Sequence, residues 1–166
     1  MADEFYVRND IPLDSPPLCL AYVNCEIGEE INSNEKGEYS SNFVAIGCLN
    51  GLIQIWDLDI LGEFLYMQWN MAVLSKKYFL DAPGPAYTLR GHEKSSMVIS
   101  LGSLGENLIS GGSDGKLLLW SLQSGSKIQL GNKSESPINQ CVYVNKKQIC
   151  SGDANGRLQI FKHKKE

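Results

Sequence analysis

Three residues in the middle of the chain are of the types that carry out acid–base and nucleophilic chemistry. His92 and Asp114 could form an acid–base pair, and Ser110 could be the nucleophile that this pair activates. The glycine-rich run over 111–115 lies close to them in sequence. An apolar, strand-like segment follows that run, whereas a phosphate-binding loop would be followed by a helix N-terminus. The role of the trio therefore depends on the elements that carry it.

Those elements are a strand, a tight turn and a second strand, and they recur along the chain. Asp114-Gly115 suits a two-residue hairpin turn, where glycine adopts positive φ at low steric cost. In each copy the turn glycine lies five residues before an aromatic residue, as in Gly51 and Trp56, Gly115 and Trp120, and Gly156 and Phe161. The aromatic residues are 64 and 41 residues apart. The second interval is the period of a propeller blade, roughly 40–45 residues, and the first is one such period plus an insertion.

The copy around Trp120 carries further signature residues. Gly91-His92 precedes it, and Trp56-Asp57 occurs in the first copy. The chain thus resembles the WD-repeat β-propeller family, in which a His, a Ser, an Asp and a Trp form a buried hydrogen-bonded relay. The resemblance implies a structural tetrad of His92, Ser110, Asp114 and Trp120. It also favours a structural over a catalytic role for the trio, so we expect no catalytic residue and no enzyme activity.

The other two copies keep only part of the tetrad. The partial repeat positions are Trp56, Asp57, Ser151 and Phe161. In the first copy Ile46 and Asn50 stand in the serine and aspartate positions, and in the third copy Asn155 stands in the aspartate position and no histidine is found. We expect both blades to be less rigid than the middle one.

Composition is that of an ordinary globular domain. The 166 residues are 43% hydrophobic and 20% charged, with a net charge of −4, so the surface as a whole should not attract nucleic acid. The five cysteines include no Cys-x-x-Cys pair and there are only two histidines. We expect free thiols in a reducing compartment, and neither a metal nor a cofactor. The start of the chain predicts no secretory signal, and no apolar run is long enough to span a membrane.

These patterns predict an all-β protein of about three four-stranded WD40-type blades, a partial propeller. Residues 1–16 would be the outer strand and connector of a preceding blade. Residues 17–90 would form a blade with an apolar insertion at 61–84, a short helix or a lid, and residues 91–131 the next blade. Residues 132–166 would form a third blade that lacks its last strand.

A narrower resemblance points to function. Phe5-Tyr6-Val7 and Ile55 to Ile60 are similar to a group of eukaryotic WD-repeat proteins implicated in assembling the large ribosomal subunit. The resemblance implies a protein–protein interaction scaffold in ribosome biogenesis and rRNA processing, in the nucleus and nucleolus, bound to proteins of a pre-ribosomal or other multiprotein complex. The alternative is a peptide- or histone-reading propeller in chromatin or transcription. The alternative location is the cytoplasm, and no membrane partner is expected.

Small basic clusters are the candidate contacts with rRNA or a partner. They consist of Lys76, Lys77, Lys146, Lys147, Lys164 and Lys165. A few cations add only local affinity for phosphate, so the competing interpretation is a set of solvated turns and a solvated tail.

The number of blades raises a question of assembly. A closed propeller needs about six or seven blades, and this sequence accounts for about three. One explanation is that the chain is part of a longer propeller. The other is a homodimer that closes a six-bladed ring, in which the strand at 5–8 of each copy completes the third blade of the other.

Overall fold

A computed structural model describes residues 13–24, 42–58, 84–93 and 96–162. The strand predicted at 5–8 lies outside the described residues, as does all of the predicted insertion except Gly84. Within the described residues the structure is three antiparallel sheets, which confirms the all-β class and the open, partial propeller.

The first sheet has the strand order β1-β2-β3-β4. Its strands are β1 (Pro17–Asn24), β2 (Asn42–Cys48), β3 (Leu52–Asp57) and β4 (Tyr87–Arg90). The β2–β3 hairpin turns through Gly51, whose φ is 78°. That conformation is strained for any residue with a Cβ atom, which explains why the sequence places Asn-Gly there.

The second sheet repeats this order as β5-β6-β7-β8, and the third contains β11-β10-β9. The second consists of β5 (Val98–Leu104), β6 (Asn107–Gly112), β7 (Leu117–Ser121) and β8 (Lys127–Gln129). The third consists of β9 (Ile138–Asn145), β10 (Gln148–Asp153) and β11 (Leu158–Lys162). Both repeat the glycine turn, at Gly115 with φ 74° and at Gly156 with φ 78°.

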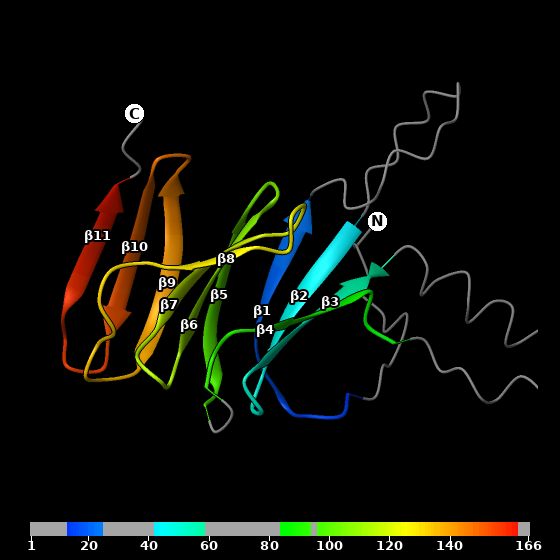
Figure 1. The fold of residues 1–166 in the computed structure, drawn as a ribbon, viewed down its shortest axis with the longest axis horizontal. Helices are drawn as coiled ribbons and strands as arrows, with labels where there is room; N and C mark the ends of the chain where they lie inside the picture. The colour runs from blue at the N-terminus through cyan, green and yellow to red at the C-terminus, as the bar shows by residue number, and fades with distance from the viewer. Residues whose placement is uncertain (1–12, 25–41, 59–83, 94–95, 163–166) are drawn as a thin grey trace, which may run out of the picture.

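The three sheets follow one another in chain order, with the second between the other two (Figure 1). Their first strands are the main points of contact, because β5 packs against β1 on one side and β9 on the other. We call the face of a sheet that points toward the next sheet in the chain its forward face, and the opposite face its backward face.

Alternate residues along each strand fill the two interfaces between sheets. The first interface buries apolar side chains of the first and second sheets: Val23, Phe43, Ala45, Ile53, Ile55, Val98, Leu101, Leu108, Leu118 and Trp120. The second buries a smaller set: Ile109, Leu117, Ile138, Cys141 and Ile149. Burial of apolar surface between twisted sheets is the main force that holds such blades together.

Candidate functional site

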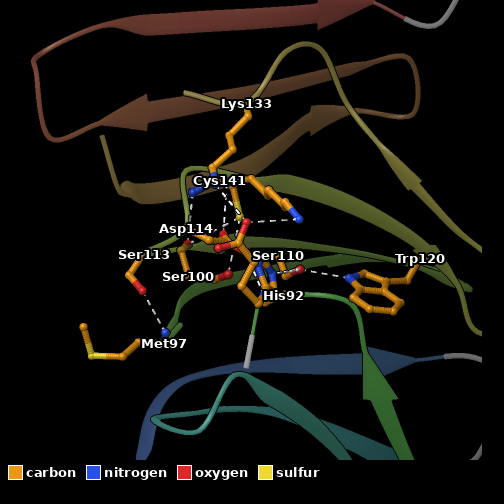
Figure 2. Close-up of polar contacts among 11 residues, drawn as sticks. His92, Met97, Ser100, Ser110, Ser113, Asp114, Trp120, Lys133 and Cys141 are labelled. Carbon is orange, nitrogen blue, oxygen red and sulfur yellow. Dashed lines mark hydrogen bonds and ion pairs between the residues drawn. The ribbon is translucent and has the colours of Figure 1, made fainter. Parts of the chain in front are cut away.

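The strands of the second sheet and the segment before it bring the four tetrad residues into one chain of hydrogen bonds (Figure 2). Trp120 on β7 donates its indole N–H to Ser110 Oγ on β6 at 2.9 Å. Ser110 Oγ lies 2.8 Å from His92 Nε2. His92 Nδ1 lies 3.0 and 3.1 Å from the two carboxylate oxygens of Asp114 in the turn after β6.

The two ends of the chain of hydrogen bonds set its direction, because the indole N–H can only donate and the ionised Asp114 carboxylate can only accept. With neutral imidazole, the Ser110 oxygen accepts from Trp120 and its O–H donates to His92 Nε2. His92 Nδ1–H then donates to Asp114. Each polar atom of the relay thereby has a partner, which is what a buried polar network requires to be stabilising.

Asp114 also caps its own turn. Its carboxylate accepts the backbone N–H of Glu93 at 3.0 Å and that of Lys116 at 3.1 Å. Burial alone would raise the pKa of Asp114, but the hydrogen bonds from His92 and from these two amides outweigh it and lower the pKa to about 2. The carboxylate is therefore charged at neutral pH and is a hydrogen-bond acceptor, the role that the relay needs.

Burial decides between relay and catalysis. Ser110 is 0% exposed, and the side chains of His92 and Asp114 are also 0% exposed. A nucleophilic serine must reach substrate, whereas here its oxygen lies between an indole and an imidazole. The trio that resembles acid–base machinery thus joins the segment before the second sheet to β6, β7 and their turn.

Removal of the imidazole should therefore cost stability. His92→Ala removes one buried hydrogen-bond partner from Asp114 and one from Ser110, and we expect the free energy of unfolding to fall by about 1–3 kcal/mol. Urea titration followed by tryptophan fluorescence measures it. Gln129→Ala is the control, because it removes an exposed side-chain hydrogen bond to the Gly131 carbonyl oxygen and should cost no more than about 0.5 kcal/mol. A His92→Ala variant as stable as the parent would show that the relay is not a structural bond.

The first sheet replaces the relay with two local contacts. Trp56 donates its indole N–H to the side-chain oxygen of Gln54 at 3.1 Å. Asn50 accepts the N–H of Leu52 at 3.2 Å and closes the turn as Asp114 does in the second sheet. Asp57, the other half of the signature dipeptide, is the last residue of β3.

In the third sheet Ser151 is buried and Phe161 half-buried, and a different aspartate closes the turn. Asp153 accepts the backbone N–H groups of Asn155 and Arg157 at 3.1 and 2.9 Å, and the Ser134 hydroxyl at 2.8 Å. Neither Asp153 nor Ser134 was predicted as a site residue. The available signal was that Asp153 stands where the second copy has a glycine.

Steric contact explains that exchange. A Cβ atom on Gly112, the counterpart of Asp153, would lie 2.4 Å from His92 Nδ1 and 2.6 Å from Asp114 Oδ1. The relay therefore requires glycine at this position. The third copy has no histidine in the relay position, so the position is open to an aspartate that supplies the turn's hydrogen bonds itself.

The predicted basic contacts are only partly described. Lys146 and Lys147 are exposed in the turn between β9 and β10, and together with Lys162 at the end of β11 they line one cavity. The other predicted lysines, at positions 76, 77, 164 and 165, lie outside the described residues. Lys133 was not predicted, and it pairs with Glu93 at 2.8 Å, which joins the segment before the third sheet to the segment before the second.

The described cysteines indicate no reactive or metal-binding site. Cys19, Cys48, Cys141 and Cys150 are free thiols, and burial raises the pKa of the Cys141 thiol to about 11, far from the reactive range. Among the described residues no three His, Cys, Asp or Glu side chains are grouped as metal ligands. This part of the chain also contains no helix that is long and apolar enough to cross a membrane.

Known proteins share both the repeat and the sequence. Residues 84–121 match the family described as WD domain, G-beta repeat. The periodic tryptophan protein 1 homolog of Drosophila melanogaster is 26% identical over 165 residues, which cover 96% of this chain and 32% of that protein. Periodic tryptophan protein 1 of Saccharomyces cerevisiae is 29% identical over 136 residues, 73% of this chain and 21% of that protein. The chain thus spans about a third or less of these relatives.

Solved structures share the fold. The β-propeller domain of Myceliophteria thermophila Cps50 (Swd1) aligns with a TM-score of 0.52 at 22% identity, over 74% of this chain and 33% of that one. A chain of the mitotic checkpoint complex aligns with a TM-score of 0.53 at 19% identity, over 77% and 32%. Together with the complete relay and the repeated glycine turns, these matches show a WD40 repeat over residues 84–121 and the fold of consecutive β-propeller blades.

Proposed function

We propose that the chain is a non-catalytic scaffold in ribosome biogenesis, which assists large-subunit assembly and rRNA processing in the nucleolus through contacts with other proteins. The observation that carries this proposal is the similarity to the periodic tryptophan protein 1 homolog over 96% of the chain. The motif over 55–60, in and after β3, is part of that resemblance. The buried relay supports the non-catalytic part, because its titratable groups are used to hold the second sheet together.

The proposal is tested with the tagged chain in eukaryotic cells. We expect it to sediment with precursors of the large subunit on a sucrose gradient and to co-purify precursor rRNA. Depletion of the native protein should make precursor rRNA accumulate. Diffuse cytoplasmic location with no sedimentation alongside these particles would contradict the proposal. Co-purification with histones instead would favour the alternative, a peptide- or histone-reading propeller.

The end faces of the three sheets carry a second proposal, about assembly. On the backward face of the first sheet, Leu20 is 64% exposed and Tyr22 is 55% exposed. On the forward face of the third sheet, Leu158 is 69% exposed and Ile160 is 59% exposed. By register from the turn glycine, Leu158 and Ile160 correspond to Leu117 and Leu119 of the second sheet, which face the second interface.

On the first sheet the exposed part of the backward face is at β1, since Ile46, Cys48 and Trp56 on the same face are already buried. The side chains that stay exposed on the two end faces are apolar, like those packed inside the chain. Exposed apolar faces of this kind associate in water, and a second copy offers the matching partner for each of them. We propose that two copies pack head to tail, the third sheet of each against the first sheet of the other, and form a six-bladed ring with twofold symmetry.

Sedimentation equilibrium of the purified chain at micromolar concentration tests this assembly. We expect a dimer, and we expect Leu20→Glu and Ile160→Glu each to give a folded monomer because a charge would be buried at the contact. Ile128→Glu is the matched control: Ile128 is 60% exposed on β8, away from both end faces, and its variant should remain dimeric. A folded parent chain that stays monomeric would rule out the ring.

A further inference from the structure

A cavity of about 490 Å³ opens between the second and third sheets. Leu119 of the second sheet and Leu130, just after β8, line one side, and Ile149 and Phe161 line it from the third sheet. The walls are thus mainly apolar, and the cavity lies at the second interface. We call it the inter-blade cleft.

Comparison of the two interfaces shows why the second is open at this place. Counted from the turn glycines Gly51 and Gly115, Phe43 in the first sheet corresponds to Asn107 in the second. Phe43 is 4% exposed and fills the first interface, whereas Asn107 is exposed and lines the cleft.

The opposite wall loses volume in the same way. Trp120, which is 2% exposed in the first interface, corresponds to Phe161 in the second. An asparagine therefore faces a phenylalanine where the first interface packs a phenylalanine and a tryptophan. The side chain on each of the two facing walls is thus smaller than its counterpart in the first interface. The volume left unfilled is the inter-blade cleft.

The charged side chains of the lining and one unpaired hydroxyl indicate which kind of ligand the cleft would bind. Lys146, Lys147 and Lys162 line the cleft, and among the residues that the structure describes no aspartate or glutamate does. The Tyr143 hydroxyl, also in the lining, is buried and makes no hydrogen bond in the structure. A buried hydroxyl without a partner costs free energy that a ligand with a hydrogen-bonding group would recover.

We propose that the inter-blade cleft binds a short acidic peptide segment of a partner protein, with an apolar side chain inserted between the blades and carboxylates against the three lysines. Apolar walls with a cationic rim match an amphipathic acidic peptide. A single-stranded RNA would need exposed aromatic rings for base stacking, whereas Tyr143 and Phe161 are both half-buried. The proposal does not depend on the assignment to ribosome assembly.

Fluorescence anisotropy with defined probes tests the site directly. The probes are a labelled Glu-Glu-Leu-Phe-Glu-Glu peptide, the same peptide with Ala-Ala at its centre, and a labelled twelve-nucleotide oligouridine. We expect the first peptide to bind, and the Ala-Ala peptide to bind about tenfold more weakly because it lacks the apolar anchor. Stronger binding of oligouridine than of peptide would overturn the proposal in favour of an RNA contact.

Variants then locate the binding. Lys147→Glu should weaken binding of the Leu-Phe peptide by about tenfold or more, because it puts a carboxylate at the rim. Arg157→Glu makes the same charge change in the turn at the other end of the third sheet and should leave affinity within about twofold. Asn107→Phe restores the aromatic of the first interface and should abolish binding in a chain that circular dichroism shows to be folded. Undiminished binding by Asn107→Phe and Lys147→Glu would overturn the proposal.

Discussion

Gly115→Ala is expected to lower the free energy of unfolding by about 2–5 kcal/mol, from a left-handed backbone conformation combined with a steric clash. Gly115 has φ 74°, and a Cβ atom there would lie 2.2 Å from the carbonyl oxygen of Ser134 and 3.1 Å from that of Ser136. The same segment is bound by a hydrogen bond from Ser134 N–H to the Gly115 carbonyl oxygen at 2.8 Å. The methyl group would therefore push apart the second sheet and the segment that enters the third.

Gly156→Ala separates the two causes. Gly156 occupies the same place in the third sheet with φ 78°, and a Cβ atom on it would meet nothing within 4 Å. The free energy of unfolding of Gly156→Ala should therefore fall only by the cost of the left-handed backbone conformation, about 1–2 kcal/mol. Guanidinium titration of both variants, with matched slopes, gives the comparison. If the free energy of unfolding fell equally in the two variants, the Ser134 segment would move aside at no energetic cost, and the two sheets would not be closely joined there.

Trp120→Ala is expected to lower the free energy of unfolding by about 3–5 kcal/mol, the usual cost of removing a core aromatic. Trp120 is 2% exposed and packs in the first interface against residues of both sheets. Its loss leaves a cavity between blades and takes one hydrogen bond from Ser110. Thermal and chemical unfolding monitored by circular dichroism measure the change.

Trp120→Phe divides that loss between packing and hydrogen bonding. Phenylalanine is the residue found at the corresponding position 161, so the blade accommodates it. It keeps most of the apolar contact but cannot donate to Ser110, and we expect a loss of about 1–2 kcal/mol. If Trp120→Phe were as damaging as Trp120→Ala, the indole hydrogen bond rather than packing would hold the first interface.

Much of the fold follows from local signals. Asn50-Gly51, Asp114-Gly115 and Asn155-Gly156 each predict a tight turn, and each glycine has positive φ in the structure. This success has a physical cause, because backbone strain at a turn depends on the residue itself and hardly on its distant neighbours. The flanking apolar runs are then restricted to strands that pair across the turn.

The tetrad was reached in a different way. The resemblance to WD repeats implied a relay of His92, Ser110, Asp114 and Trp120. The hydrogen-bond distances in the structure supply its geometry. The turn bonds of Asp153 were missed because they replace the relay in a copy without the histidine. The replacement of glycine by aspartate at this position is explained only by the tertiary structure, in which Gly112 lies against the His92 imidazole.

The sequence by itself determined the repeat, its turns and the β class, since all of these depend on spacing along the chain, whereas the residues of the relay were implied by the resemblance to WD repeats. Only the tertiary structure decided which faces are covered and where a cavity remains. The inter-blade cleft depends on Asn107 and Phe161, which are 54 residues apart. Whether a side chain fills an interface depends on the volume of the residue opposite it on another sheet, and pairs of that kind are set by how the sheets pack rather than by any local pattern.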